Sequence, residues 1–373
     1  MERIDVLPDD VLLDIFDFCV GMNFRAQYRL DLQVEKWRVE AWQVLVHVCR
    51  RWRSVVLQSS SRLNLHLYCT PKTPTRDTLD VWRLWPALPL LVGLGYGMTS
   101  KTGMDNIVVA LGQSNRVRRV TLLDLVDWQL EKLLAAMQVP FSELTDLYLA
   151  RQRKTLPVIP IPDSFLGGSA PRLQDFYLSS IPFPGLPNLL LSATHLVQLR
   201  LFNIPHSGYI SPEAMVAVLS ALASLGSFDL QFRSPQSRPD FESRSLPPPK
   251  RSILPALNVF SFRGVTEYLE DLLTFIDTPR LNSLYSAFFN QIDFDCPRLA
   301  QFINRTPSLR ALDDAHVQFD DFSASVELRS RTSESTFDVD DLSIDIGVIC
   351  ASGRLPASVP VQAMRTGLEC SSW

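Results

Sequence analysis

A glycine-rich stretch followed by a lysine comes nearer to a ligand-binding motif than any other part of this sequence. It reads Gly93-x-Gly95-x-Gly97 and continues to Lys101-Thr102-Gly103. Closely spaced glycines let backbone N–H groups approach a phosphate. However, a P-loop needs glycine directly before the lysine, where this chain has Ser100, and the dinucleotide fingerprint needs its third glycine three residues after the second. We therefore interpret the stretch as a flexible turn.

The histidines, cysteines and paired aspartates form no motif of catalysis or metal binding. They are His47, His66, His195, His206 and His316, Cys19, Cys49, Cys69, Cys296, Cys350 and Cys370, and Asp313-Asp314 and Asp320-Asp321. The histidines lack a Gly-x-Ser-x-Gly or His-Glu-x-x-His context, the cysteines lack Cys-x-x-Cys spacing, and the aspartates lack a glycine-centred calcium loop. We expect no catalytic residue, no metal ligand and no cofactor, with the cysteines as reduced thiols. The sequence therefore predicts that the protein is not an enzyme, and no motif favours the alternative of a site assembled from scattered residues.

Composition and charge narrow the class of protein further. Of the 373 residues, 46% are hydrophobic and 20% are charged, which is typical of a globular protein with a large core. The formal net charge of −4, with both signs interspersed, lacks the basic field that nucleic acid or anionic lipid attracts. No apolar run approaches the roughly 18 residues of a membrane helix, and no signal-peptide core follows the first residues. We expect a soluble protein of the cytoplasm, the nucleus or both, with neither nucleic acid nor membrane as a partner.

Two short amphipathic helices are predicted at the amino terminus. Pro8 suits a first helical turn, and Asp9 and Asp10 oppose the helix dipole, so the first helix should begin at Leu7 or Pro8. Its apolar stripe consists of Val11, Leu12, Ile15, Phe16 and Cys19. A second helix, expected at about 35–57, has a similar stripe of Val44, Leu45, Val48, Cys49, Trp52, Val55 and Val56, with Arg50, Arg51 and Arg53 facing away. Two such helices bury little area, so we expect a partner surface to cover them.

The residues of this helix pair resemble an F-box, the module with which substrate receptors dock onto the Skp1 adaptor of cullin-RING ubiquitin ligases. The resemblance lies in Leu-Pro-x-x-x-Leu-x-x-Ile-Phe at 7–16 and in Val-Cys-Arg-Arg-Trp-Arg at 48–53. It implies that the Skp1-binding residues are Leu7, Pro8, Val11, Leu12, Ile15 and Phe16 of the first helix, and Val48, Cys49 and Trp52 of the closing helix. The chain departs from the family in its long insertion at about 20–41. The alternative interpretation is an ordinary amphipathic cap on the body that follows.

The body repeats the pattern Leu-x-x-Leu-x-Leu. Nearly complete copies begin at Val117, Leu144, Leu173, Leu196, Leu225 and Leu257, and weaker copies begin at Leu281 and Leu309. The central apolar positions 120, 147, 176, 199, 228, 260, 284 and 312 are 23 to 32 residues apart, in or near the range of leucine-rich repeats. Each copy should form a short strand whose alternate side chains enter the core. The predicted fold class is α+β, an irregular leucine-rich-repeat horseshoe or α/β solenoid behind the helices.

The segments between the copies favour helical returns in most places. Helical apolar spacing occurs at 104–113, 127–138, 211–225, 266–277 and 297–304. Ser211 suits an N-cap, because Pro212 follows it at the first helical position. The proline-rich stretch 181–187 should be extended instead.

The body also resembles the F-box proteins with degenerate leucine-rich repeats that are abundant in mushroom-forming (basidiomycete) fungi. The supporting residues are Leu-Leu-Leu-Ser-Ala at 189–193, Gly-Tyr-Ile-Ser-Pro-Glu-Ala-Met at 208–215 and Glu-Tyr-Leu-Glu-Asp at 267–271. We expect an F-box-like domain at 1–60, a solenoid at 61–345 with an exposed Pro/Ser/Arg-rich loop at 233–251, and an irregular tail at 346–373.

These resemblances imply a substrate-recognition adaptor of an SCF-type (Skp1–cullin–F-box) ubiquitin ligase. The F-box would bind a Skp1-like adaptor and through it a cullin, and the repeats would bind an unknown target protein. Catalysis would belong to the partners. The alternative is a leucine-rich-repeat interaction scaffold without a role in ubiquitin transfer.

Overall fold

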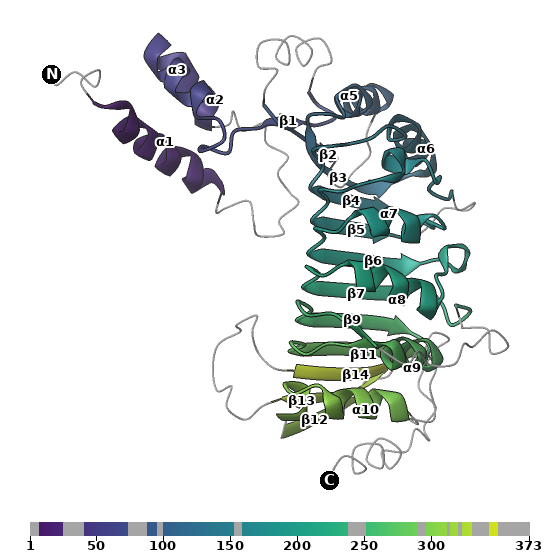
Figure 1. Cartoon of the computed structure of the whole chain (residues 1–373). Helices are drawn as coiled ribbons and strands as arrows, with labels where there is room; N and C mark the ends of the chain where they lie inside the picture. The colour runs from purple at the N-terminus through teal and green to yellow at the C-terminus, as the bar shows by residue number, and fades with distance from the viewer. Residues whose placement is uncertain are drawn as a thin grey trace. The chain divides into compact units, whose positions relative to one another are not determined.

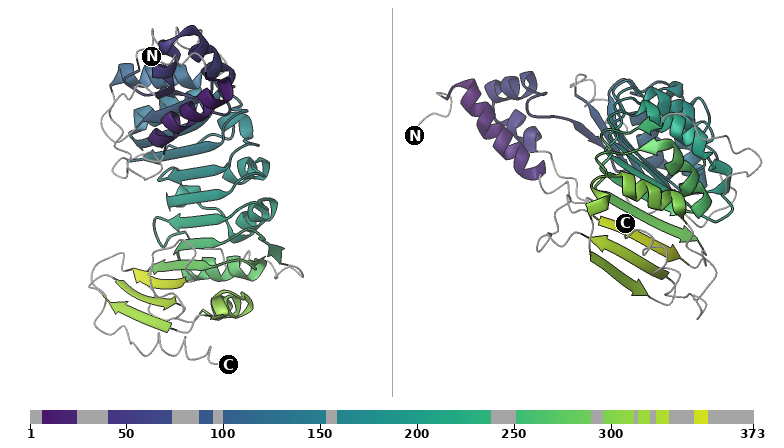
Figure 2. Two further views of the ribbon diagram at one scale, coloured as in Figure 1. Left: turned by 90° about the vertical axis from the view of Figure 1, so that its left-hand side faces the viewer. Right: turned by 60° about the horizontal axis from the view of Figure 1, so that its bottom comes forward.

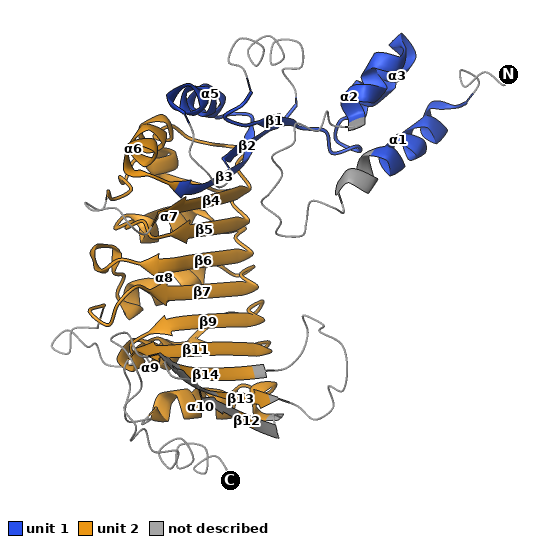
Figure 3. Ribbon diagram, turned by 180° about the vertical axis from the view of Figure 1, so that it is seen from behind, with its two compact units in different colours: residues 1–124 blue, residues 125–373 orange. Residues whose placement is uncertain are grey.

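The computed structural model describes residues 7–24, 41–73, 88–94, 100–152, 159–237, 251–289, 296–311, 314–319, 323–329 and 343–349. The fold is of the mixed α/β class with a large, mainly parallel sheet (Figure 1). The chain divides into two compact units, residues 1–124 and residues 125–373 (Figure 3). The domain boundary that the sequence predicts at residue 60 lies within the first unit.

The first unit begins with three helices, α1 (Asp9–Phe24), α2 (Ala41–Val48) and α3 (Arg50–Gln58). Helix α1 begins at Asp9, one residue after the Pro8 start that the sequence predicts, and the Leu12 N–H donates to the carbonyl of Pro8 at 3.1 Å. Of the predicted insertion, residues 20–24 continue α1 and Ala41 begins α2, while residues 25–40 lie outside the described residues.

The prediction of one helix over 35–57 is wrong, because the helix is interrupted at Cys49. This residue has an extended backbone (φ −156°, ψ 171°), and its sulfur accepts the Trp52 N–H at 3.4 Å as the N-cap of α3. A side chain that satisfies a free N–H at a helix start favours a new helix over continuation of the old one.

Parallel strands and a helix complete the first unit. Strands β1 (Leu67–Cys69), β2 (Leu90–Leu94) and β3 (Val117–Leu125) pair in this order. Helix α5 (Lys101–Leu111) begins after Ser100, whose hydroxyl accepts the Gly103 N–H at 3.1 Å. The stretch interpreted as a turn therefore ends in a capped helix start, while Gly95 and Gly97 lie outside the described residues.

The second unit contains the main part of the parallel sheet. Strands β4 (Asp146–Arg151), β5 (Asp175–Ser179), β6 (Gln198–Ile204), β7 (Ser227–Phe232), β9 (Val259–Gly264) and β11 (Ser283–Phe289) lie in this order and pair in parallel. The predicted central positions Leu147, Phe176, Leu199, Phe228, Phe260 and Leu284 are direct register partners and are fully buried. Their burial in one aligned row is confirmed, whereas position 312 lies outside the described residues.

An antiparallel meander ends the sheet. Strand β14 (Ser343–Ile349) pairs in parallel with β11, β13 (Ser323–Arg329) pairs antiparallel to β14, and β12 (Asp314–Phe319) pairs antiparallel to β13. Residues 346–349 therefore belong to a strand and not to the predicted tail, because Ile344 and Ile346 are buried against the sheet. Residues 350–373 of that tail and residues 238–250 of the predicted loop lie outside the described residues. A separate two-stranded ribbon joins β8 (Ser252–Ile253) to β10 (Ile276–Asp277).

Helices connect many of the strands in the second unit. They are α6 (Asp127–Ala136), α7 (Leu186–Ser192), α8 (Pro212–Ala221), α9 (Thr266–Phe275) and α10 (Pro297–Arg305), with 3-10 turns at Phe165–Gly168, His206–Gly208 and Leu309–Ala311. Helices α7 to α10 contact one another in succession along the sheet (Figures 1 and 2). The Ser211 cap is confirmed, since its hydroxyl accepts the Ala214 N–H at 3.2 Å. The stretch predicted to be extended is non-helical up to Gly185, but α7 then begins at Leu186.

Candidate docking and recognition surfaces

Three helices of the first unit share a small packed core. Leu12 and Phe16 of α1 are fully buried, as are Trp42 and Val46 of α2 and Val56 of α3. The Phe16 ring packs against the Trp52 ring with centroids 4.8 Å apart, and Trp52 as a whole is half-buried. Two of the residues expected to face a partner, Leu12 and Phe16, therefore lie inside this three-helix module, where they hold the helices together.

Other apolar side chains of the same helices face solvent. On α1, Val11, Ile15 and Phe18 have exposed fractions of 39%, 43% and 68%. On α2, Val44 and Val48 are 56% and 54% exposed. We call these five residues the apolar stripes, because steps of three and four residues place them on one side of each helix.

The apolar stripes include two residues outside the predicted Skp1-binding set, Phe18 and Val44, of which Val44 belongs to the apolar positions predicted for the second helix. Their signal in the sequence is helical spacing, because Phe18 follows Ile15 by three residues and Val44 precedes Val48 by four. Leu7 and Cys49 are half-buried at the ends of α1 and α3, and Pro8 is exposed.

Arginines of α3 connect the three helices through polar contacts. Arg51 donates to the Asp9 carboxylate, with Nη2 and Oδ1 2.7 Å apart, and to the carbonyl of Leu7. Arg53 Nε donates to the carbonyl of Val46 at 2.9 Å. Arg50 and Arg53 are exposed and Arg51 is half-buried, and the donors of Arg51 and Arg53 satisfy groups at the ends of α1 and α2.

In the second unit, the side of the sheet opposite the buried row carries polar and aromatic side chains. We call this side the open face. Its central row consists of the register partners Tyr148, Tyr177, Arg200, Asp229, Ser261, Tyr285 and Asp345, continued by Glu327 of β13. The strands alternate buried and partly exposed side chains, as a sheet with one covered side requires.

An aromatic and ionic cluster occupies the β4–β6 part of the open face. Arg200 Nη2 lies 3.0 and 3.1 Å from the two carboxylate oxygens of Asp175, which also accepts the Tyr148 hydroxyl. The guanidinium carbon of Arg200 lies 5.6 Å from the Tyr148 ring centroid and 5.8 Å from that of Tyr177. Burial, together with the hydrogen bond to Asp175, raises the pKa of Tyr148 well above its usual value. Two tyrosine rings and one carboxylate thus form the binding site of the Arg200 guanidinium.

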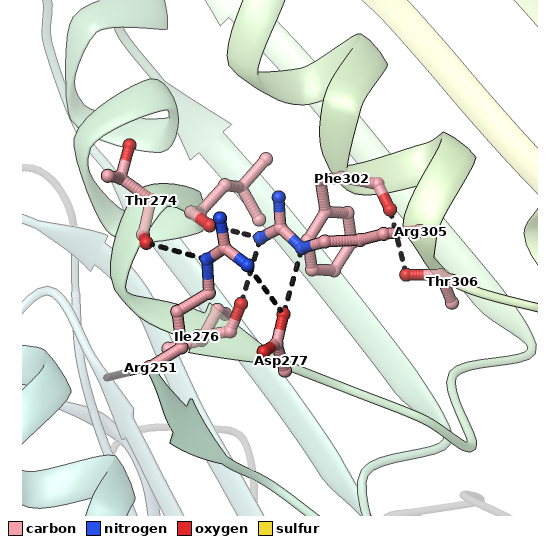
Figure 4. Close-up of polar contacts among 8 residues, drawn as sticks. Arg251, Thr274, Ile276, Asp277, Phe302, Arg305 and Thr306 are labelled. Carbon is pink, nitrogen blue, oxygen red and sulfur yellow. Dashed lines mark hydrogen bonds and ion pairs between the residues drawn. The ribbon is translucent and has the colours of Figure 1, made fainter. Parts of the chain in front are cut away.

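A second ionic cluster joins α9, β10 and α10 (Figure 4). Arg305 Nε lies 2.8 Å from Asp277 Oδ1, and its Nη2 donates to the carbonyls of Leu273 and, at 2.9 Å, Ile276. Arg251 approaches the same carboxylate oxygen at 3.8 Å and donates to the Thr274 carbonyl at 3.3 Å. The two arginines satisfy carbonyls at the end of α9, so we assign this cluster a structural role.

Neither a metal-binding group of His, Cys, Asp and Glu side chains nor a helix long and apolar enough to cross a bilayer occurs in the described part of the chain. Among the described cysteines, Cys19, Cys49, Cys69 and Cys296, none forms a disulfide, and Cys350 and Cys370 lie outside the described residues. Of the aspartate pairs, Asp314 begins β12, whereas Asp313, Asp320 and Asp321 are not described.

Comparison of the sequence with models of known protein families found no match, and comparison with curated proteins found none either. The F-box resemblance therefore depends on the sequence motifs alone.

Proposed function

We propose that this protein is the substrate-recognition adaptor of an SCF-type ubiquitin ligase. Helices α1, α2 and α3 act as the F-box, which binds a Skp1-like adaptor and through it a cullin. The following body is a degenerate leucine-rich-repeat solenoid that binds a target protein. The observation that carries the proposal is the pair of apolar stripes, which remain exposed although the three helices already have a packed core.

The arrangement of the helices supports two different roles for the motif residues, one in folding the module and one in contacting a partner. Leu12 and Phe16 keep the module folded, so they act on a partner only through the positions of their neighbours. Val11, Ile15 and Val48 are left to make direct contact. Burying apolar surface contributes roughly 25 cal/mol per Å², so covering these side chains and those of Phe18 and Val44 would favour association.

The body supports the proposal through its repeated geometry. Successive copies of the motif supply strands that lie side by side in chain order, with the central apolar residues as register partners. Each repeat buries its apolar side chains against those of the neighbouring repeats, which is how repeat proteins build a continuous core. The polar alternate positions then remain for recognition of a target.

The contribution of such an adaptor is proximity. Ubiquitin transfer would be catalysed by the partners, and the adaptor would raise the effective concentration of the target near the ubiquitin donor. We place the protein in the cytoplasm, the nucleus or both, where these ligases act, and relate it to the fungal proteins that its motifs resemble.

Co-purification with Skp1 tests the proposal directly. The double variant Ile15→Asp and Val48→Asp should lose co-purification with Skp1, because two charges in the apolar stripes would be buried without partners. Its thermal unfolding should be unchanged, because both side chains are exposed in the free protein.

The matched control is Leu191→Asp on α7, where the leucine is 49% exposed but lies outside the three-helix module. This variant should bind Skp1 like the parent protein. Equal recovery of Skp1 with the double variant and with the control would rule out the F-box assignment and favour an interaction scaffold without a ubiquitin role.

A further inference from the structure

We propose that the second unit escapes modification by the ubiquitin that the ligase transfers, because the cations on its surface are mainly arginines and not lysines. This inference rests on the proposed function and deepens it, because it states how the adaptor avoids becoming a target of its own ligase. It concerns Leu125–Trp373, the unit to which we assign target recognition.

The basic residues of the sequence are divided very unequally between the two types. Thirty of the 36 are arginine, and the six lysines are Lys36, Lys72, Lys101, Lys132, Lys154 and Lys250. Beyond Lys154 the imbalance is stronger, with fifteen arginines and one lysine, and residues 251–373 contain ten arginines and no lysine. The positive charge of the second unit is thus carried mainly by guanidinium groups.

The described lysines follow the same division between the units. Lys72 and Lys101 are exposed and belong to the first unit. Lys132 on α6 belongs to the second unit and is half-buried. No fully exposed lysine therefore occurs in the described part of the second unit.

At several arginines of the second unit, the contacts require the guanidinium itself. Arg200 lies over two tyrosine rings and approaches both oxygens of one carboxylate. Arg305 donates to Asp277 and to two backbone carbonyls, and Arg151, whose side chain is 2% exposed, pairs with Asp127 at 2.7 Å. A lysine ammonium would not reproduce these contacts, because they use the planar shape and the several donors of arginine.

Three exposed arginines of the same unit have no such reason. They are Arg233 after β7, Arg280 before β11 and Arg310 in the 3-10 turn that follows α10. Their side chains form no hydrogen bond or ion pair with another described residue. Lysine would supply the same charge at these solvent-facing positions. The remaining difference between the two residues is chemical reactivity, because lysine is the acceptor of ubiquitin.

The chemistry of transfer explains why arginine is inert. An uncharged lysine ε-amine attacks the thioester carbonyl that joins the carboxyl end of ubiquitin to a cysteine of the conjugating enzyme. The C–N isopeptide bond forms, the C–S bond breaks, the cysteine leaves as a thiolate, and the amine loses one proton. The guanidinium of arginine stays protonated, since its pKa exceeds about 12, and it has no free amine lone pair for this attack.

Proximity makes this protection useful to an adaptor. The ligase accelerates transfer by raising the effective concentration of lysines near the thioester, and this effect acts on every lysine within reach. A target leaves after modification, whereas the adaptor stays bound to Skp1 and meets the ubiquitin donor again. Arginine on the recognition unit removes the acceptor amine but keeps the charge.

Self-modification of the full-length adaptor in the reconstituted ligase tests the inference. The ligase is assembled with Skp1, cullin, RING subunit and conjugating enzyme, and lysine-free ubiquitin ensures that each acceptor takes one ubiquitin. The variant combines Arg233→Lys, Arg280→Lys and Arg310→Lys, which raises the number of lysines in the second unit from three to six. Modification of this unit should rise about twofold, because the number of acceptors at the same effective concentration doubles. Mass spectrometry should find new Gly-Gly remnants at positions 233, 280 and 310.

The matched control combines Arg233→Gln, Arg280→Gln and Arg310→Gln, which removes the same guanidinium groups without adding an amine. It should be modified like the parent protein, and both variants should unfold at the temperature of the parent because all three side chains are exposed. Unchanged modification of the lysine variant, without remnants at the new positions, would overturn the proposal. An equal rise in the glutamine control would overturn it as well, because loss of arginine and not gain of an amine would then be the cause.

The outcome is separable from that of the adaptor proposal. Co-purification with Skp1 is measured on the same preparations before the ubiquitin assay. Intact Skp1 binding without a gain in the lysine variant rejects only the inference about arginine. Failure of the parent protein to bind Skp1 rejects the adaptor role and, with it, this inference.

Discussion

Asp229 is the residue of the open face whose ionisation most clearly lowers the stability of the folded protein. Burial raises the pKa of its carboxyl from 3.8 to about 6, although hydrogen bonds from Gln231 and Ser261 and the charge of Arg200 oppose the shift. Its Oδ1 atom is buried without a hydrogen-bond donor among the described residues. The folded state therefore holds the proton more tightly than the unfolded state does.

The raised pKa of Asp229 makes the stability of the folded protein depend on pH in a definite direction. Below pH 3.8 the carboxyl is protonated in both states, and the folded protein loses stability as the pH rises from there through about 6. Asp229→Asn, which stays neutral, should therefore raise the melting temperature at pH 7.5, and the gain should shrink as the pH falls toward 4. Thermal unfolding of both proteins at the two pH values measures the difference. An equal loss of stability in the variant at both pH values would show that the charge of Asp229 does not destabilise the folded protein.

Which side of a helix faces a partner is hard to predict from residue types alone. Helix α1 has two neighbouring apolar sets, Leu12 with Phe16 and Val11 with Ile15 and Phe18. Both sets have helical spacing, so the sequence predicts a broad stripe without indicating which half packs internally. Packing of α2 and α3 against α1 selects the side of Leu12 and Phe16, and the Phe16 ring contacts the Trp52 ring of α3.

At the scale of elements, the cluster around Asp277 stabilises the junction of α9, β10 and α10. A helix end leaves carbonyls without partners inside the helix, and Arg305 donates to two carbonyls there while it pairs with Asp277. Arg305→Met keeps much of the aliphatic length but removes these donors. It should lower the free energy of unfolding by about 1 to 3 kcal/mol.

Arg251→Met is the matched control for this prediction. Arg251 shares the same carboxylate at a longer distance, 3.8 Å, and is more exposed than Arg305. Its loss should cost less than about 1 kcal/mol. Chemical denaturation of both variants measures the two values, and an equal cost would contradict the assignment of the carbonyl contacts to Arg305.

Element boundaries differ in how well the sequence predicts them. The start of α8 is predictable, because Ser211 and Pro212 are a local signal that needs no distant contact. The break between α2 and α3 is not, because Cys49 is a weak capping residue and the apolar pattern continues across it. That break is fixed by contacts far along the chain, among them Arg51 with Asp9 and the ring contact of Trp52 with Phe16.

At the scale of the molecule, one row of buried side chains runs through the parallel strands of the second unit. Leu199 lies in this row on β6, between Phe176 and Phe228. Leu199→Ala should lower the free energy of unfolding by about 2 to 5 kcal/mol, because the cavity would be enclosed on both sides. Leu191→Ala, at an exposed position on α7, should have little effect. Denaturant unfolding monitored by circular dichroism compares the two, and similar values would contradict the assignment of Leu199 to the core row.

The parallel part of the sheet is predictable for a physical reason. Each copy of the motif is local in sequence, and successive copies pair with their neighbours, so the aligned row from Leu147 to Leu284 follows from spacing alone. The position of β14 does not follow from the spacing of the motif. Its pairing with β11 skips two intervening strands, and no local pattern specifies a contact over that separation.

The position of β14 also has a consequence for the order of folding. In the main sheet, strands β5, β6, β7, β9 and β11 each pair with the preceding strand of that sheet, so this part can grow by addition of short-range contacts. Strand β11, however, keeps one row of backbone N–H and C=O groups unpaired until α10, β12, β13 and finally Ser343–Ile349 have been synthesised. During that interval the nascent chain presents an open sheet edge, the feature that most readily recruits a strand from another chain. Strand β14 thus covers the edge of β11, and among the described strands the edge of the finished sheet passes to β12.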